Sequence, residues 1–323
     1  MMPNRRALLL APVAVSALAA PALAQERWPN RPIRFLFPWS PGGVVDGYLR
    51  LCFDQAGQEL GQPIVLESRS GARGTLAAQF LVQQARGDEH VFAHHHLSII
   101  RHPLLTRART WDPIEDFTYV MQQSGFVFGI VVHASSPWRS LSDLITAARA
   151  APGRLTFATS GVATSNHLAM EEILFRDGVQ MEHVVFRGAS DALNALLGRQ
   201  IHAIAGSNTW APAVEAGTLR LLCVWTRDRL AAFPEVPTLR ELGYDMVVTS
   251  PWGVVGPRGL PAAAVRRLHD ALARAHRSEA VVAHMRRFDM PDEYLGPDDY
   301  LSFARAQFER ERAVVARLNL SID

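Results

Sequence analysis

Three short loops rich in glycine, serine and threonine each stand between a predicted strand and a predicted helix, at 39–46, 159–167 and 186–191. The first N–H groups of a helix have no partner inside the helix, and the helix dipole is positive at that end. Glycine lets a ligand approach the backbone and hydroxyl groups add donors, so these loops predict an anion-binding site. The same residues also suit ordinary strand–helix turns and helix caps, and none has the spacing of a phosphate-binding loop.

Strand and helix signals alternate along the chain, which indicates an α/β fold. Strands are expected at 33–37, 64–66, 91–93, 127–132, 155–158, 183–186, 201–205 and 219–224. Helices are expected at 46–60, 76–85, 140–150, 166–176 and 189–197, and over most of the chain after residue 262. The sequence has neither a fixed-period repeat nor a linker, so we expect two lobes in one body, with the chain crossing between them more than once.

The composition is that of a globular chain. Its 323 residues, 48% hydrophobic and 20% charged, are enough for about two domains and exclude a mainly disordered protein. All 33 basic residues are arginines, and they face 31 acidic residues. Because no block of like charge accompanies this balance, we predict no nucleic-acid partner.

The N-terminus has the pattern of a cleavable export signal. Arg5 and Arg6 precede an apolar run at 8–20 that is short for a membrane span, and 22–24 reads as a cleavage site. We therefore expect a signal peptide at 1–24 and a periplasmic mature protein that is not embedded in the membrane. The paired arginines also resemble a weak twin-arginine signal, which leaves the export route open.

Two cysteines, Cys52 and Cys223, lie in apolar patterns and are expected to be buried free thiols in different lobes. The chain has no G-x-S-x-G elbow and no H-E-x-x-H motif. We therefore expect a binding protein that is not an enzyme and that needs no cofactor.

Several longer motifs follow one another along the mature chain: 28–33, 38–43 with Asp46, 61–67, 111–117, 159–161, 187–189 and 234–238. In this order and at these spacings they resemble the substrate-binding proteins of tripartite tricarboxylate transporters, the TctC or Bug type. The resemblance extends over essentially the whole mature chain.

This resemblance implies an α/β, two-lobed periplasmic binding protein, a type II-like Venus flytrap with two hinge strand crossings. Lobe I would comprise 25–126 and 252–323, and lobe II would comprise 127–251. The crossings would lie near 126–131 and 250–253.

The implied function is capture of a small carboxylate by hinge closure and delivery to the membrane subunits of a transporter. A ligand sensor for a membrane sensor kinase needs the same cleft, so that alternative stays open. We expect a monomer, with an organic acid, aromatic acids among the candidates, as the ligand.

The candidate ligand-binding residues either match the family's motifs or stand at positions that line the cleft in the family, and no catalytic residue is expected. On lobe I they are Trp39, Pro41, Gly42, Gly43, Asp46, His95, His96 and Trp252; on lobe II they are Thr159, Ser160, Gly161, Thr164, Ser165, His167, Arg187, Gly188 and Asn208. A carboxylate is expected to bridge the Gly42–Gly43 turn and the Ser160–Gly161 loop.

The chain departs from the family's pattern after the third strand. His94, His95 and His96 stand where many members have small polar residues, and Trp39 stands where Phe is common. One hypothesis makes His95 or His96 a partner of an aromatic acid. A metal site is a less favoured hypothesis, with His90, His94, His96 and His102 as its ligands. A third hypothesis has these histidines packed or solvated at a strand end.

Overall fold

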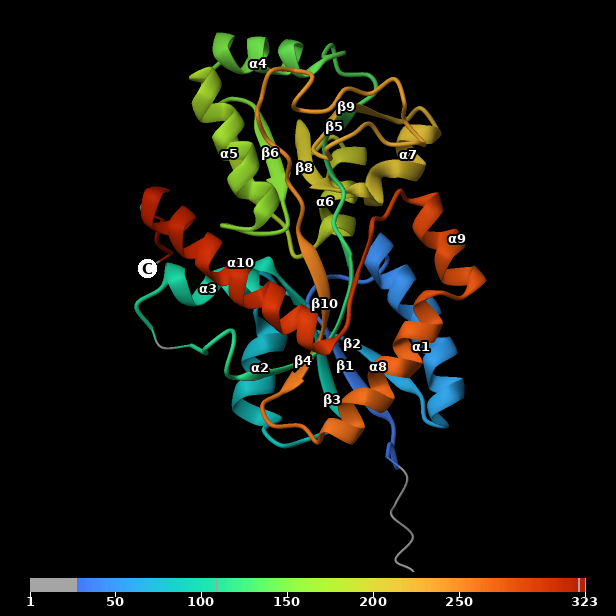
Figure 1. Cartoon of the computed structure of the whole chain (residues 1–323). Helices are drawn as coiled ribbons and strands as arrows, with labels where there is room; N and C mark the ends of the chain where they lie inside the picture. The colour runs from blue at the N-terminus through green and yellow to red at the C-terminus, as the bar shows by residue number, and fades with distance from the viewer. Residues whose placement is uncertain (1–27, 109, 319, 323) are drawn as a thin grey trace, which may run out of the picture.

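The computed structural model describes residues 28–108, 110–318 and 320–322. The predicted signal peptide at 1–24 lies outside these residues. Within them the chain forms two lobes, one above the other in Figure 1, and each lobe has its own β-sheet with helices packed around it. This confirms the predicted two-lobed α/β architecture. No helix in the described part of the chain is long and apolar enough to cross a membrane.

The first lobe contains a six-stranded sheet in the order β11-β4-β10-β3-β1-β2. Its strands are β1 (Ile33–Phe37), β2 (Ile64–Ser68), β3 (Val91–His96), β4 (Phe117–Gly125), β10 (Pro251–Pro257) and β11 (Asp292–Leu295). Its helices are α1 (Val44–Leu60), η1 (Ala72–Gly74), α2 (Leu76–Gln84), α3 (Leu97–Leu105), α8 (Ala262–His276), α9 (Glu279–Arg287) and α10 (Pro297–Leu318). Because β1 and β3 are parallel neighbours, their carboxyl ends meet at one edge, where Trp39 and His96 are in contact.

The second lobe contains a five-stranded sheet in the order β7-β6-β8-β5-β9. Its strands are β5 (Phe128–His133), β6 (Thr156–Thr159), β7 (Glu182–Val185), β8 (Ala203–Ser207) and β9 (Leu219–Val224). Its helices are α4 (Leu141–Ala150), α5 (Ser165–Asp177), α6 (Ala189–Leu197), η2 (Asn208–Trp210) and α7 (Ala211–Glu215). β6 is parallel to both β7 and β8, so the loops that follow these three strands gather at one edge.

Two segments lead from one sheet to the other. β4 belongs to the first sheet and ends at Gly125, and β5 of the second sheet begins at Phe128. The chain returns to the first sheet at β10, which begins at Pro251. The two segments run side by side, because the Phe126 N–H donates a hydrogen bond to the Ser250 carbonyl at 3.2 Å.

Most of the predicted strands and helices are present within a few residues, but the region after the third strand differs. β3 continues through His96, and α3 begins at the next residue. The sequence pattern predicts neither α3, which follows a strand without a turn and contains Pro103, nor β4. Strand β4 is almost entirely buried although it carries the polar run Gln122–Ser124, and polar residues inside a buried strand hide the usual apolar signal.

Helix α1 packs one face against the first sheet and against α8. Its buried side chains include Tyr48, Leu49, Cys52 and Phe53, which recur at helical spacing. Cys52 and Cys223 are both free and buried, as predicted, and they lie in different lobes. Burial raises the pKa of each thiol to about 12, so both stay protonated at neutral pH and neither has the thiolate that nucleophilic attack needs.

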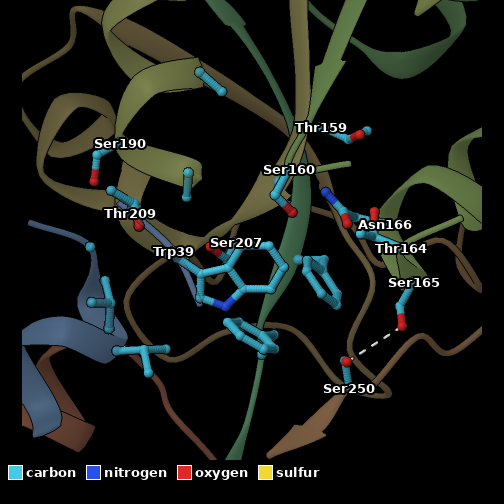
Figure 2. Close-up of a pocket in the computed structure, with 18 of the residues that line it drawn as sticks. Trp39, Thr159, Ser160, Thr164, Ser165, Asn166, Ser190, Ser207, Thr209 and Ser250 are labelled. Atoms are coloured by element: carbon cyan, nitrogen blue, oxygen red, sulfur yellow. Dashed lines mark hydrogen bonds between the residues drawn. The ribbon is translucent and has the colours of Figure 1, made fainter. Parts of the chain in front are cut away.

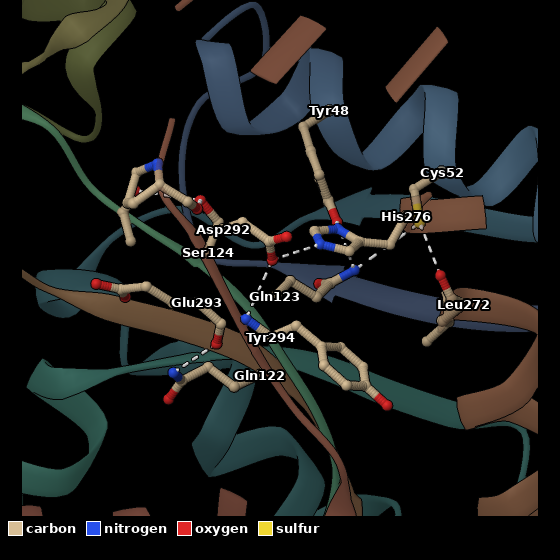
Figure 3. Close-up of polar contacts among 12 residues, drawn as sticks. Tyr48, Cys52, Gln122, Gln123, Ser124, Leu272, His276, Asp292, Glu293 and Tyr294 are labelled. Carbon is tan, nitrogen blue, oxygen red and sulfur yellow. Dashed lines mark hydrogen bonds and ion pairs between the residues drawn. The ribbon is translucent and has the colours of Figure 1, made fainter. Parts of the chain in front are cut away.

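A row of hydrogen-bonded polar groups, buried except for Asp292, connects four elements of the first lobe (Figure 3). His276 of α8 contacts the Tyr48 hydroxyl through Nδ1 at 2.6 Å and the Asp292 carboxylate through Nε2 at 3.0 Å. Gln123 of β4 also donates to the Tyr48 hydroxyl, at 3.3 Å. The order carboxylate, imidazole, hydroxyl resembles a catalytic relay, but Tyr48 is fully buried and burial raises the pKa of its phenol well above the usual value. These hydrogen bonds therefore hold α1, β4, α8 and β11 together and do not activate a nucleophile.

A buried ion pair in the first lobe includes an arginine that also contacts the second lobe. Arg101 of α3 donates to the Glu311 carboxylate of α10 at 2.5 and 3.0 Å, and both side chains are only about 5% exposed. The same guanidinium donates to the Ala163 carbonyl of the second lobe at 2.8 Å. A buried guanidinium needs all of these partners, because an unpaired buried charge is strongly unfavourable.

We predict that Glu311→Gln lowers the free energy of unfolding by about 3–5 kcal/mol, because it leaves the Arg101 guanidinium buried without its counter-charge. Urea denaturation of the mature chain measures this change. Glu309→Gln is the matched control on the same helix, since Glu309 pairs with Arg312 at the exposed surface and should matter little. Equal effects of the two substitutions would contradict the prediction.

Candidate functional site between the two lobes

A cavity lies between the lobes, with about 690 Å³ of empty space, part of it open to solvent. Both lobes contribute to it, mainly through the segments that follow β1, β3, β6, β7 and β8. Figure 2 shows Trp39 of the first lobe together with Ser160, Ser190 and Ser207 of the second. The lining residues are Phe37, Trp39, Ser40, Gly43, Val44, Val45, His96, Ser98, Phe126, Phe128, Thr159, Ser160, Thr164, Ser165, Asn166, Ala189, Ser190, Ala192, Ile204, Gly206, Ser207, Thr209 and Ser250. Hydroxyl groups and apolar side chains dominate this set, which contains no arginine and no carboxylate.

The N-termini of α1 and α6 meet at one corner of the cavity, each from a different lobe. Gly43 is the N-cap of α1, and a Cβ atom added to it would lie 3.5 Å from Thr209 Oγ1 and 3.8 Å from Ser190 Oγ. Ser190 follows the N-cap of α6, and its hydroxyl is buried without a hydrogen-bond partner among the described residues. We call Gly43, Val44, Ser190 and Thr209 the amide corner. Backbone N–H groups, hydroxyls and two dipoles converge there, so it can hold an anion.

The acidic residues in the first turns of these two helices already have partners. Asp46 accepts a hydrogen bond from the Gly42 N–H at 3.1 Å and pairs with Arg50 at 3.0 Å. Asp191 accepts a hydrogen bond from the Ser40 hydroxyl across the lobe boundary at 2.7 Å. Neither carboxylate lines the cavity, so the positive ends of α1 and α6 are left for a ligand.

The loop after β6 reaches the opposite side of the cavity, and its own hydrogen bonds hold it in shape. Thr159 Oγ1 contacts His183 Nε2 at 2.6 Å, and the Thr164 hydroxyl donates to the Gly161 carbonyl at 2.7 Å. His167 Nδ1 accepts a hydrogen bond from the Ala163 N–H at 3.1 Å. These groups set the position of Ser160 and of the N-terminus of α5, but their own hydrogen-bonding capacity is largely used.

Aromatic rings form another side of the cavity. We call this set the aromatic wall, and it comprises Phe37, Trp39, His96, Phe126 and Phe128. The Trp39 and His96 rings are 5.0 Å apart, and Phe126 stacks on Phe128 at 5.7 Å. This wall draws on β1, β3 and the first crossing segment, so a ring bound there would touch both the first lobe and the hinge.

The three consecutive histidines occupy three different environments, because successive side chains on a strand point to opposite faces. His96 lines the cavity. His94 lies behind it on the same face, fully buried, and stacks on Trp252 at 5.2 Å. His95 points to the other face, where its Nδ1 contacts the Tyr300 hydroxyl at 3.0 Å.

Burial keeps these imidazoles neutral. It lowers the pKa of His96 to about 4 and that of His95 to about 3, and it lowers the pKa of His94 well below its usual value. The nearby histidines add smaller repulsive contributions for His94 and His95. At neutral pH the run therefore contributes aromatic surface and no positive charge.

The predicted site residues divide into two groups. Seven line the cavity: Trp39, Gly43, His96, Thr159, Ser160, Thr164 and Ser165. The others lie outside the lining: Pro41, Gly42, Asp46, His95, Gly161, His167, Arg187, Gly188, Asn208 and Trp252. Several of the second group hold the site in place. Gly188 lies against Ser40 of the other lobe, and the Asn208 side chain donates to the Phe288 carbonyl. Arg187, by contrast, is exposed.

Other lining residues were missed by the sequence patterns, among them Ser207, Thr209 and Ser250. Ser207 is the last residue of β8 and Thr209 follows that strand. Both come after the predicted strand at 201–205, and a polar residue in that position was the signal that could have found them. Ser250 lies in the second crossing segment, and no sequence pattern marks it as a lining residue. Its hydroxyl accepts a hydrogen bond from Ser165 at 3.4 Å, next to the N-terminus of α5.

The hypothesis of a metal site concerns His90, His94, His96 and His102. Among the residues that the structure describes, no group of three histidine, cysteine, aspartate or glutamate side chains could hold a metal ion. Of these four histidines, His102 stacks on Trp111 at 4.9 Å, and His94 stacks on Trp252 at 5.2 Å.

The family model described as the tripartite tricarboxylate transporter family receptor matches residues 49–320. The chain belongs to this receptor family. A UPF0065 protein from the gbd 5' region of Cupriavidus necator is 38% identical over 318 residues, which cover 98% of this chain and 97% of that protein. BugT of Bordetella pertussis is 29% identical over 310 residues, which cover 94% of each chain.

Among solved structures, the R. palustris protein Rpa4515 with adipate has a TM-score of 0.83 and 27% identity. The match covers 91% of this chain and 99% of that one. The receptor family, the Bug-type relative and this structure together confirm the resemblance seen in the motifs, and they agree with the two-lobed fold described above.

We predict that the receptor loses stability as the pH falls from 7 to 5. A buried histidine that resists protonation binds fewer protons in the folded chain than in the unfolded chain over this range, so acid favours unfolding. Each such histidine contributes about 2 kcal/mol to the loss, given an unfolded pKa near 6.5. Urea denaturation at pH 7, 6 and 5 measures it. His95→Phe, which keeps a ring at this position, should remove one such contribution, and an unchanged pH dependence in this variant would refute the assignment.

Proposed function

We propose that the receptor captures a small carboxylate in the cavity between its lobes and, once closed, presents it to the membrane subunits of a tripartite tricarboxylate transporter. The observation that carries this proposal is the amide corner. Two helix N-termini from different lobes converge on one corner of the cavity, which an anion would occupy only when the lobes are together. Family membership and the relative solved with adipate support a carboxylate as that anion.

The ligand position that we propose differs from the bridge expected from the sequence. Gly43 faces Thr209 and Ser190, whereas a Cβ on Gly161 would lie 3.1 Å from the Arg73 Cα. The carboxylate is therefore assigned to the space between α1 and α6. The loop after β6 closes over the remainder of the ligand.

We also propose that the lobes, 25–126 with 252–323 and 127–251, move about the paired crossing segments. The hydrogen bond from Phe126 to Ser250 keeps these segments together, and this supports a common hinge. Export to the periplasm through the predicted signal peptide is part of the same proposal. Ligand binding then shifts an equilibrium between open and closed forms toward the closed form.

The first experiment is a thermal-shift screen of residues 25–323 against small carboxylates, followed by calorimetry on the acids that raise the melting temperature. A ligand that binds only the folded chain stabilises it by mass action. Stabilisation by at least one small acid is expected. The absence of any shift across di-, tri- and aromatic carboxylates would refute the proposal.

We predict that Gly43→Leu weakens carboxylate binding at least tenfold, because the new side chain occupies the amide corner. Gly43 has a φ of −82°, so a side chain can be added there without backbone strain. Gly296→Leu is the matched control, since Gly296 also directly precedes a helix but does not line the cavity, and it has only ordinary contacts near its Cβ position. Unchanged affinity in Gly43→Leu, with the fold intact, would show that the anion binds elsewhere.

We further predict that Gly188→Ala impairs closure. A Cβ on Gly188 would lie 2.9 Å from the Ser40 nitrogen in the other lobe, closer than real Cβ atoms approach backbone. The variant should bind carboxylates more weakly than the parent, and ligand should reduce its radius of gyration less in small-angle scattering. Gly296→Ala serves as the control. Parental affinity and parental compaction in Gly188→Ala would count against closure at this contact.

A further inference from the structure

The cavity provides for one negative charge and surrounds the rest of a ligand with uncharged groups. Its lining includes no arginine and no carboxylate, and its only titratable side chain is His96, which burial keeps neutral. The side chains of Thr159, Thr164 and Asn166 already make hydrogen bonds inside the second lobe. A second carboxylate would find only hydroxyl groups and the single N-terminus of α5, with no cation and no second pair of convergent helix N-termini, so its lost water would be poorly replaced in a closed site.

The Trp39 and His96 rings are fixed from behind by the backbone of Gly74. A Cβ on Gly74 would lie 2.7 Å from Trp39 Cη2 and 2.8 Å from His96 Nε2, and the residue has a φ of +80°, which favours glycine. Any side chain there would displace the two rings toward the cavity. The two rings therefore pack directly against the Gly74 backbone, and His96 Nε2 also contacts the Gly74 carbonyl at 3.4 Å.

The aromatic surface continues from the cavity into the core of the first lobe. The ring of His94 lies 5.6 Å from that of His96 and stacks on Trp252 with an interplanar angle of 25°, and Trp252 packs on Tyr48. Trp252, His94 and Tyr48 are fully buried. Rings that are packed from behind in this way cannot shift easily to fit a ligand. The aromatic wall therefore selects ligands by shape as well as by polarity.

From these observations, and resting on the proposed function, we infer that the receptor selects a monocarboxylic acid built on a flat, uncharged aromatic ring over aliphatic dicarboxylates. The carboxylate occupies the amide corner, and the ring lies against Trp39 and His96 of the aromatic wall. Offset or edge contacts between aromatic rings add binding free energy beyond that of the buried area. An aliphatic chain of equal size lacks this contribution.

Calorimetry with three acids tests this inference on the mature chain, residues 25–323. Benzoate is the aromatic monocarboxylate, hexanoate is an aliphatic monocarboxylate, and adipate is an aliphatic dicarboxylate. We expect benzoate to bind at least tenfold more tightly than adipate and at least threefold more tightly than hexanoate. Tighter binding of adipate, or equal binding of hexanoate and benzoate, would overturn the inference and leave the proposed function standing. Binding of none of these or other carboxylates would overturn both.

Variants of Trp39 separate selection from simple support of the fold. Trp39→Ala should lower benzoate affinity at least tenfold and bring the ratio of benzoate to hexanoate affinity close to one, whereas Trp39→Phe should keep most of the preference. Trp138→Ala is the matched control, because Trp138 is also half-buried but lies on the second lobe against His202. Equal weakening of benzoate and hexanoate by Trp39→Ala would mean that the ring only supports the site.

Gly74→Ala gives an independent variant should Trp39→Ala fold poorly. The added methyl group pushes the Trp39 and His96 rings toward the cavity, so it should reduce benzoate affinity more than hexanoate affinity, since the flexible chain can adapt. A larger loss for hexanoate, or no loss for either acid, would contradict the role assigned to the wall.

Discussion

An anion held between two lobes without a cation beside it must be stabilised by backbone N–H groups, hydroxyls and helix dipoles. This requirement determines much of the cavity's construction. Helix N-termini combine several unpartnered N–H groups with the positive end of a dipole, and α1 and α6 both begin at the lobe boundary, where Gly43 lies near Ser190. Glycine at both N-caps, Gly43 and Gly188, lets the two lobes approach closely, as the proposed shared ligand requires. The cost of such a design is that neither lobe has a complete site alone.

Positive charge is present near the cavity, but the fold uses it for structure. Arg101 lies only three residues after Ser98, which lines the cavity, yet its guanidinium turns to Glu311 and to the Ala163 carbonyl. This contact holds the loop after β6 against the first lobe without offering a cation to the ligand. A mobile cation in the cleft would bind anions of any shape, whereas fixed N–H donors favour a carboxylate in one orientation. The separation of the two roles therefore favours specificity.

The sequence was sufficient to predict the alternation of strands and helices, the two lobes and the loops that begin α1, α5 and α6. Glycine, serine and threonine before an amphipathic helix have a direct physical meaning, so these loops could be found without a structure. The partners across the boundary could not, because they depend on how the lobes meet. Thr209 faces Gly43 although the two are far apart in the sequence, and Ser250 reaches the cavity only through the second crossing. Strand β4 was missed for a different reason: its buried face carries Gln123, whose partner Tyr48 is known only from the fold.

In the histidine run, the position of each residue on the strand determines what its side chain contacts. Read as a cluster, His94, His95 and His96 suggest a metal site or a pH-sensitive patch. On β3 the period of two sends His95 to Tyr300 and leaves His94 and His96 on the face toward the cavity, where only His96 reaches the lining. Burial then makes it unfavourable for any of the three to carry a charge at neutral pH. What remains is a set of flat, polarizable rings between Trp39 and Trp252. Three residues that are often functional because they ionise therefore contribute here as neutral rings, and of the three only His96 belongs to the aromatic wall.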